Sequence, residues 1–379
     1  MRVLWVTNDL PPRAGGIERF VGELVARVDP AEAAVIGPAY REAASWDDAQ
    51  VADVHRWRGM VHPTPALRRE IVERARSHRA EVILFGAAWP LGLLAPRLRG
   101  EAGIPVVGLT HGLEAGLVTC GMGALVRRAI AGLDLATTIS DFTESHVRRA
   151  SAATPLSRVA PGVDVERFQP DPTARAAIRA RLGIASDDLV VGNISRLVSR
   201  KGQDRLLDAW PRIRARHPRA HLVLVGEGPL ERRLRRHPAA RDRSQGVIFA
   251  GRVAGDELPK WYAALDVFAL PCRTRWSGLD VEGLGIVTLE AQAVGVPVIV
   301  GASGGAAEAV GSPTTGTVID GGDPTAIVAA IDDWLGAPER RRLAAPAARR
   351  WVVDHWSWPV IAERFRTVLT EVIARSRRV

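Results

Sequence analysis

Short apolar runs alternate with amphipathic helical patterns over the first 160 residues of the chain. Runs typical of strands lie at 2–7 (RVLWVT), 81–86, 105–111 and 135–140. Two glycines follow the first run, and the segment IERFVGELVARV after them has apolar positions spaced as on one helix face. Brief apolar runs that are bounded by turns and separated by helices favour a parallel sheet covered on both faces.

The same pattern starts again after a turn at 161–164 (PGVD) and a polar linker that reaches about residue 173. Further strand-like runs lie at 189–195, 221–228, 246–251, 266–271 and 296–303, and 354–374 has the pattern of one long amphipathic helix. The chain is therefore predicted to be α/β, with two Rossmann-like, doubly wound domains. We expect domains at 1–168 and 169–355, and a helix at 356–379 that returns to the first domain.

The segment 280–300 (DVEGLGIVTLEAQAVGVPVIV) contains two glutamates eight residues apart. On one continuous helix this spacing would turn them about 80° apart. The glycines at 283 and 285 instead place Glu282 in a loop and Glu290 in the second turn of a helix. Amides of Gly285, Ile286 and Val287 at that helix N-terminus suit an anion or sugar hydroxyls. Glu290 could then accept two hydrogen bonds from a ribose diol, although both glutamates could also be merely solvated.

Two cations follow the strand-like run at 189–195. Arg196 and Lys201 lie in a strand–loop–helix pattern that suits a diphosphate, because arginine offers a planar fork and lysine a mobile point charge. The alternative is that both are ordinary surface cations in an arginine-rich chain.

Composition narrows the function classes. The 379 residues are 47% apolar and 25% charged, as in a soluble protein, and Lys plus Arg exceed Asp plus Glu by 9. This excess suits an acidic substrate, such as a sugar nucleotide, or an anionic membrane surface. No membrane-spanning run and no secretory leader are found, so we expect a cytoplasmic protein. Cys120 and Cys272 support neither a disulfide framework nor a zinc site, and no nucleic-acid-reading module is present.

Other chemistries have weaker signals. The run 301–305 (GASGG) matches G-x-S-x-G, and Asp354 and His355 follow in the order of a serine hydrolase. A hydrolase would leave Arg196 and Lys201 unexplained, as would a glycoside hydrolase built on the glutamate pair. His217 and His221 flank Pro218, which argues against a helical metal pair. The chain lacks Asp-x-Asp, so we expect no metal requirement, with cations and helix amides offsetting the diphosphate.

A family resemblance emerges from several segments in order: RLVSRKG, GRV, EGLGIVTLEAQAVGVPVI and ASGGAAE. They resemble the retaining glycosyltransferases of family 4, whose GT-B fold has two Rossmann-like domains facing a central cleft, and Glu282 and Glu290 match that family's E-x7-E motif. The segments TNDLPPRAGGIE, FGAAWPLGLLAP, PGVDVERF and GLDVEGLGIVTLEAQAVGVPVIVGASGG resemble actinobacterial GDP-mannose-dependent mannosyltransferases acting on phosphatidylinositol mannosides.

The resemblance implies roles in the second, nucleotide-sugar-binding domain. Arg196 and Lys201 would hold the diphosphate, Glu290 the ribose, and Glu282 the sugar and its developing positive charge. Backbone groups near Val253 would meet the base. The donor would be a sugar nucleotide, GDP-mannose, with no further cofactor.

It also implies roles in the first, acceptor-side domain. Gly15 and Gly16 would let the loop approach the donor phosphate, His111 would face the transferred sugar, and Asp9 would lie near the acceptor hydroxyl. A nucleotide-sugar epimerase of the same build remains an alternative activity.

The chain departs from the expected pattern near the acceptor. GLEAGLVTCGMG follows His111 where a segment with His and Trp is expected, Trp276-Ser277 replaces a glycine-rich loop, and Ala307 precedes Glu308. The acceptor could be an amphiphile or cyclitol resembling phosphatidylinositol mannoside, or a soluble natural product.

A cluster of arginines at 56–79 favours a peripheral position at the inner face of the plasma membrane, although an ordinary surface helix with solvated arginines would have the same sequence. In this stretch Leu67, Ile71 and Ala75 share one predicted helix face, and most of the arginines lie off it.

Overall fold

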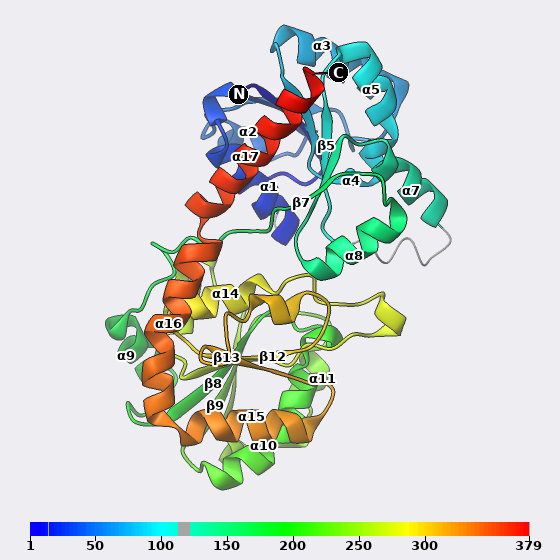
Figure 1. Ribbon diagram of the computed structural model, residues 1–379. Coiled ribbons are helices and arrows are strands. Elements are labelled where there is room, and N and C mark those ends of the chain that lie inside the picture. Colours follow the sequence, from blue (N-terminus) through cyan, green and yellow to red (C-terminus); the bar gives the residue numbers. More distant parts are fainter. Residues whose placement is uncertain (14, 113–121, 379) are drawn as a thin grey trace. The chain divides into compact units, whose positions relative to one another are not determined.

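The computed structural model describes residues 1–13, 15–112 and 122–378. The chain forms two compact units (Figure 1). The first comprises Met1–Pro161 with Pro359–Val379, and the second comprises Gly162–Trp358. The altered segment after His111, including Cys120, lies almost wholly at 113–121 and so outside the described residues.

The first unit is built on a seven-stranded parallel sheet of order β3-β2-β1-β4-β5-β6-β7. Its central strands are entirely buried, which explains their continuous apolar sequence. The strands are β1 (Val3–Val6), β2 (Ala33–Pro38), β3 (Asp53–Trp57), β4 (Val82–Phe85), β5 (Val106–Leu109), β6 (Leu135–Thr138) and β7 (Leu156–Arg158).

Helices complete this unit, and α3 illustrates why they form. The Thr64 hydroxyl accepts from the Leu67 amide, Pro65 occupies the first turn, and the buried face includes the expected Leu67, Ile71 and Ala75. The helices are α1 (Gly16–Arg27), α2 (Ala43–Asp47), α3 (Pro65–Ser77), α4 (Ala88–Leu91), α5 (Ala95–Ala102), α7 (Gly123–Ala131), α8 (Asp141–Ala150) and α17 (Trp358–Ser376), with short 3-10 turns η1 (Pro30–Glu32) and η2 (Gly92–Leu94).

The second unit repeats the design on a six-stranded parallel sheet of order β10-β9-β8-β11-β12-β13. Both sheets reverse their strand order beside the first strand of their series, as in doubly wound folds, so the predicted α/β class with two Rossmann-like halves is confirmed. The strands are β8 (Leu189–Ile194), β9 (Ala220–Val225), β10 (Val247–Gly251), β11 (Val267–Leu270), β12 (Val298–Gly301) and β13 (Gly316–Ile319).

The helices of the second unit pack around a core that includes the fully buried Trp210 and Trp334. They are α9 (Pro172–Arg181), α10 (Gln203–Arg216), α11 (Glu231–Arg235), α12 (Pro238–Arg241), α13 (Leu258–Ala263), α14 (Ile286–Ala293), α15 (Pro324–Gly336) and α16 (Pro338–Trp356). The 3-10 turns are η3 (Ser199–Lys201), η4 (Arg243–Gln245), η5 (Gly255–Glu257), η6 (Trp276–Gly278) and η7 (Ala306–Ala309).

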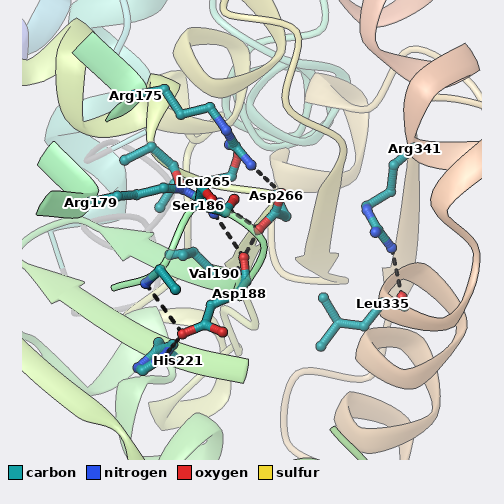
Figure 2. Close-up of polar contacts among 12 residues, drawn as sticks. Arg175, Arg179, Ser186, Asp188, Val190, His221, Leu265, Asp266, Leu335 and Arg341 are labelled. Atoms are coloured by element: carbon teal, nitrogen blue, oxygen red, sulfur yellow. Dashed lines mark hydrogen bonds and ion pairs between the residues drawn. The ribbon is translucent and has the colours of Figure 1, made fainter. Parts of the chain in front are cut away.

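A charge cluster, of which Arg179 is the buried member, fixes α9 to this sheet (Figure 2). Arg175 and Arg179 donate to the two carboxylate oxygens of Asp266 at 2.6 and 2.7 Å, and Asp266 also accepts from the Val190 amide. Burial lowers the pKa of Arg179, while Asp266 opposes that shift. The cluster ties the helix that opens the unit to the amino ends of β8 and β11, opposite the edge where a ligand is expected.

Two sequence expectations need correction. The strand-like runs identified in the sequence omit β2, β3, β7 and β13, of which β3 and β7 are only partly buried. The single helix expected at 354–374 is broken at Ser357, which is extended (φ −66°, ψ 148°), because Pro359 cannot donate to a continuing helix. Among helices of the described residues, none is long and apolar enough to cross a membrane.

Candidate active site

The second sheet reverses its strand order between β8 and β11. Ligands of doubly wound sheets bind outside the carboxyl ends of the strands at such a point. The loop after β8 carries Arg196 and Lys201, and the loop after β11 leads to Glu282. The fold therefore brings two separate sequence signals to one edge.

Lys201 and Glu282 form an ion pair at this edge, with 2.7 Å between Lys201 Nζ and Glu282 Oε2. Each side chain is only 10% exposed. Gly202 makes the contact possible, because it has φ +78° and a Cβ there would lie 2.0 Å from the Pro271 carbonyl. The two opposite charges therefore offset each other in a nearly buried place.

Arg196 lies on the same loop but projects into solvent. Its backbone is held by a buried network, in which Gln203 Nε2 donates to the Arg196 carbonyl and to the Ser195 hydroxyl at 3.0 and 2.8 Å. Ser195 in turn donates to Asn193 at 2.8 Å. The structure thus fixes the position of Arg196, while its side chain makes no ion pair within the described residues.

A third cation was not predicted from the sequence. Arg200 Nε lies 3.7 Å from Glu282 Oε2, and Arg200 Nη1 lies 3.3 Å from Asp280 Oδ1. Arg200 directly precedes Lys201, and this adjacency is the signal that could have revealed it. Glu282 therefore sits between two positive charges.

Glu282 and Glu290 occupy the local structures expected for them. Glu282 lies in the loop before α14, Gly285 adopts the left-handed conformation at the helix N-cap, and Glu290 lies within α14. Ile286 and Val287 are half-buried in the first turn, where amides have no partner within the helix. These features give α14 an N-terminus suited to anions or hydroxyls.

Glu290 has a partner that the sequence did not indicate. The Tyr262 hydroxyl on α13 donates to Glu290 Oε2 at 2.9 Å, and both residues are buried. The bond fixes one oxygen of the carboxylate. Val253, expected near the base, follows β10 and is half-buried.

The G-x-S-x-G segment supports Glu282 and does not present a nucleophile. Ser303 is 1% exposed, and its hydroxyl pairs with that of Thr274 at 3.1 Å. The Gly305 amide donates to the Glu282 carbonyl at 3.0 Å. His355, the candidate base, bonds through Nδ1 to the Trp351 carbonyl.

The remaining sequence candidates have structural partners. His217 pairs with Asp332 and His221 with Asp188, at 2.8 and 2.9 Å, so they do not converge. Cys272 is buried, and desolvation, followed by the nearby Glu282, raises its pKa to about 12.

In the first unit, Asp9 and His111 follow β1 and β5 at the carboxyl edge of the sheet. His111 Nε2 donates to the Gly86 carbonyl at 2.6 Å, and its ring meets Phe20 edge-on. Burial and then the charge of Glu18 raise the pKa of Asp9, while Arg13 opposes the shift.

The loop before α1 contains one residue that the sequence did not single out. Glu18 is 6% exposed and pairs with Arg13 at 3.0 Å. Gly15 is extended (φ 179°), and a Cβ there would meet the Glu18 carboxylate, whereas Gly16 has open space around it. The Glu18 carboxylate therefore lies against Gly15, and its charge acts on Asp9.

Comparison with protein families identifies the family of the chain. Residues 14–167 match the model of Glycosyltransferase Family 4, and residues 174–351 match that of Glycosyl transferases group 1. The chain is 42% identical over 382 residues to the GDP-mannose-dependent alpha-(1-6)-phosphatidylinositol monomannoside mannosyltransferase of Mycolicibacterium smegmatis, covering 97% of this chain and 98% of that protein. It is 40% identical to a Corynebacterium glutamicum enzyme named for the monoacylated acceptor, covering 97% of each chain.

Solved structures share the fold. The Anabaena protein Alr3699/HepE in complex with UDP superposes with a TM-score of 0.82 at 20% identity, covering 98% of this chain and 100% of that one. Sucrose-phosphate synthase from Thermosynechococcus elongatus gives 0.76 at 21% identity, covering 99% and 100%. The sequence relatives and this shared architecture lead to one conclusion: the chain belongs to the family 4 glycosyltransferases and has their GT-B fold.

Proposed function

We propose that the protein transfers a mannosyl residue from GDP-mannose, with retention of anomeric configuration, to a hydroxyl of an acceptor resembling phosphatidylinositol mannoside. The observation that carries the proposal is the Lys201–Glu282 pair at the switch point of the second sheet, with Arg196 on the same loop. The names of the relatives, which specify GDP-mannose and phosphatidylinositol mannosides, support the choice of donor and acceptor.

The charged step is departure of the diphosphate. The bond between the sugar C1 and the diphosphate oxygen breaks while the acceptor oxygen bonds to C1 from the same face. The acceptor proton passes to the departing diphosphate oxygen. Arg196, Lys201 and the amides of Ile286 and Val287 would stabilise the negative charge that develops.

The two glutamates would act on different parts of the donor. Glu290, held by Tyr262, would accept from the ribose hydroxyls. Glu282 would face the sugar and its developing positive charge once Lys201 turns to the diphosphate. His111 and Asp9 would meet the sugar and the acceptor hydroxyl from the first unit, and backbone groups near Val253 would meet the base.

A peripheral position at the cytoplasmic membrane face belongs to the same proposal, and the contacts of α3 refine it. Its apolar face is buried within the first unit, so it does not insert into lipid. Arg68 pairs with Glu101, Arg74 with Glu70, and Arg56 with Asp47. Attraction to anionic lipid would therefore rest on the remaining arginines and decrease with salt.

Purified protein incubated with GDP-mannose, UDP-glucose or ADP-glucose tests the donor, with and without a phosphatidylinositol monomannoside acceptor. We expect acceptor-dependent release of GDP and a product heavier by one hexose in mass spectrometry. Anomeric NMR of the product checks retention. Donor turnover without an acceptor would indicate an epimerase or hydrolase, and transfer only to soluble aglycones would overturn the lipid acceptor.

A further inference from the structure

A cationic cavity lies at the amino edge of the first sheet, opposite Asp9 and His111. Its volume is about 420 Å³, and its wall includes Arg2 before β1, Glu81 before β4 and Pro105 before β5. Residues at the carboxyl-terminal end of α17 also line it, and Figure 1 shows that end of α17 beside α3. A cavity of this size holds a small ligand.

Four arginines and one glutamate line the cavity, a net charge of +3: Arg2, Arg76, Arg79, Arg377 and Glu81. The Glu81 carboxylate is already satisfied, by the Arg2 amide at 3.0 Å and by Arg377 at 2.6 Å. Arg2 and Arg76 donate to the backbone carbonyls of Arg79 and Glu101. Across the described residues, Arg2, Arg76 and Arg79 have no carboxylate partner.

The negative ends of the helix dipoles offset only part of this positive charge. Residues at the carboxyl ends of α3, α5 and α17 all line the cavity, and each end carries about −0.5 of a charge, or about −1.5 together. An excess of about +1.5 remains by this accounting. Like charges held together around a cavity repel one another, and an anion would relieve that repulsion.

Arg79 occupies a position that favours glycine. It follows α3 with φ +52°, where the Ala80 amide bonds back to the Ala75 carbonyl across the helix end. Glycine is the usual residue at this site of a helix terminus, because a Cβ is disfavoured in the left-handed region. Arg79 is exposed and lines the cavity, so it accepts this strain without burying apolar surface.

We propose that this cavity binds a phosphate-bearing anion of at least two negative charges, at a site separate from the donor site. Guanidinium groups match phosphate oxygens through paired N–H donors. The phosphate could come from a soluble diphosphate or from an anionic lipid headgroup, which share this chemistry. The inference does not depend on the proposed transferase reaction.

Pyrophosphate titration by calorimetry and thermal shift tests the site. The Arg196→Ala/Lys201→Ala background removes donor-site binding from the signal. Arg79→Gly is the informative variant, because it relieves the backbone strain and keeps the fold. We expect it to raise the melting temperature while weakening pyrophosphate binding roughly tenfold, as for loss of one charge-assisted pair. Arg127→Ala, an exposed arginine on α7, is the matched control and should bind as the background does.

Vesicles identify the source of the phosphate. Saturable pyrophosphate binding that depends on Arg79 supports a soluble anion. Arg79-dependent co-sedimentation with phosphatidylinositol vesicles, without pyrophosphate binding, supports a lipid headgroup. If Arg79→Gly and Arg2→Ala/Arg76→Ala match the background for both ligands, the proposed site is wrong.

Discussion

The Tyr262 hydroxyl donates a 2.9 Å hydrogen bond to Glu290 Oε2, and Tyr262 is completely buried. Tyr262→Phe removes this bond with almost no change of volume. We expect GDP to bind roughly fivefold more weakly, corresponding to about 1 kcal/mol for one hydrogen bond. Isothermal titration with GDP measures the effect, and Glu290→Ala should exceed it. Unchanged affinity in Tyr262→Phe would show that the bond does not orient Glu290 for the nucleotide.

Loss of the Lys201 charge should affect both turnover and stability. Lys201→Met nearly keeps the length of the side chain but removes its charge. Arg200, 3.7 Å away, is then the remaining cation beside Glu282 among the described residues. We expect kcat/KM to fall by roughly 10²–10³, typical for one group that stabilises the transition-state charge. The melting temperature should fall too, because a buried carboxylate loses its closest counter-charge.

A double-mutant cycle then tests whether Lys201 and Arg196 act on one diphosphate. Arg196→Ala/Lys201→Met should lose less activity than the two separate losses combined, because both cations would serve the same group. Steady-state kinetics of the four proteins give the coupling. Strict additivity would place the two cations on different parts of the substrate.

Asp9 should make the stability of the folded protein depend on pH. Burial and the nearby Glu18 raise its pKa above the ordinary 3.8, so ionised Asp9 disfavours the folded state. The stabilising contribution of protonated Asp9 is complete below its unfolded-state pKa and is lost as the pH rises through the folded-state pKa. Asp9→Asn resembles the protonated acid. It should therefore raise the melting temperature at pH 7 but not at pH 3.

Calorimetry of Asp9→Asn at both pH values is the measurement. Transfer activity measured alongside it shows whether the unfavourable charge serves the reaction. A variant destabilised equally at pH 7 and pH 3 would mean that a lost contact, and not the carboxylate charge, determines the result.

The role of His111 can be tested by measuring donor binding and transfer separately. Its ring donates to the Gly86 carbonyl, so the structure already gives it a role at the end of β5. If it also meets the sugar, His111→Ala should bind GDP normally while transferring mannose more slowly. GDP affinity and the rate of mannose transfer, measured on one preparation of His111→Ala, decide this. Full transfer activity would indicate that His111 has a structural role and does not act on the sugar.

Chelation should leave transfer intact. In the proposed mechanism Arg196, Lys201 and the α14 amides would offset the charge of the leaving diphosphate, and the sequence has no Asp-x-Asp. Activity in EDTA equal to activity in Mg²⁺ or Mn²⁺ is the expected result. Restoration by either ion after loss in EDTA would place a metal ion in the mechanism.

The sequence by itself determined the class of fold and much of the site that belongs to the second unit. Short apolar runs bounded by turns predicted its core strands, because buried parallel strands are continuously apolar. The glycines around Glu282 and the spacing to Glu290 predicted the loop and the helix, since both follow from local backbone preferences. Partly buried edge strands such as β3 lacked that apolar signal, and the sequence analysis did not identify them.

Only the tertiary structure decided which side chains meet. Arg179 and Asp266 are 87 positions apart, and Tyr262 reaches Glu290 from another helix. Lys201 pairs with Glu282 because the sheet order places β8 beside β11, although β9 and β10 lie between them in sequence. Local propensity acts over a few residues, whereas these contacts depend on the order of the strands in the sheet. They also depend on which charged side chains are removed from water and therefore need a partner.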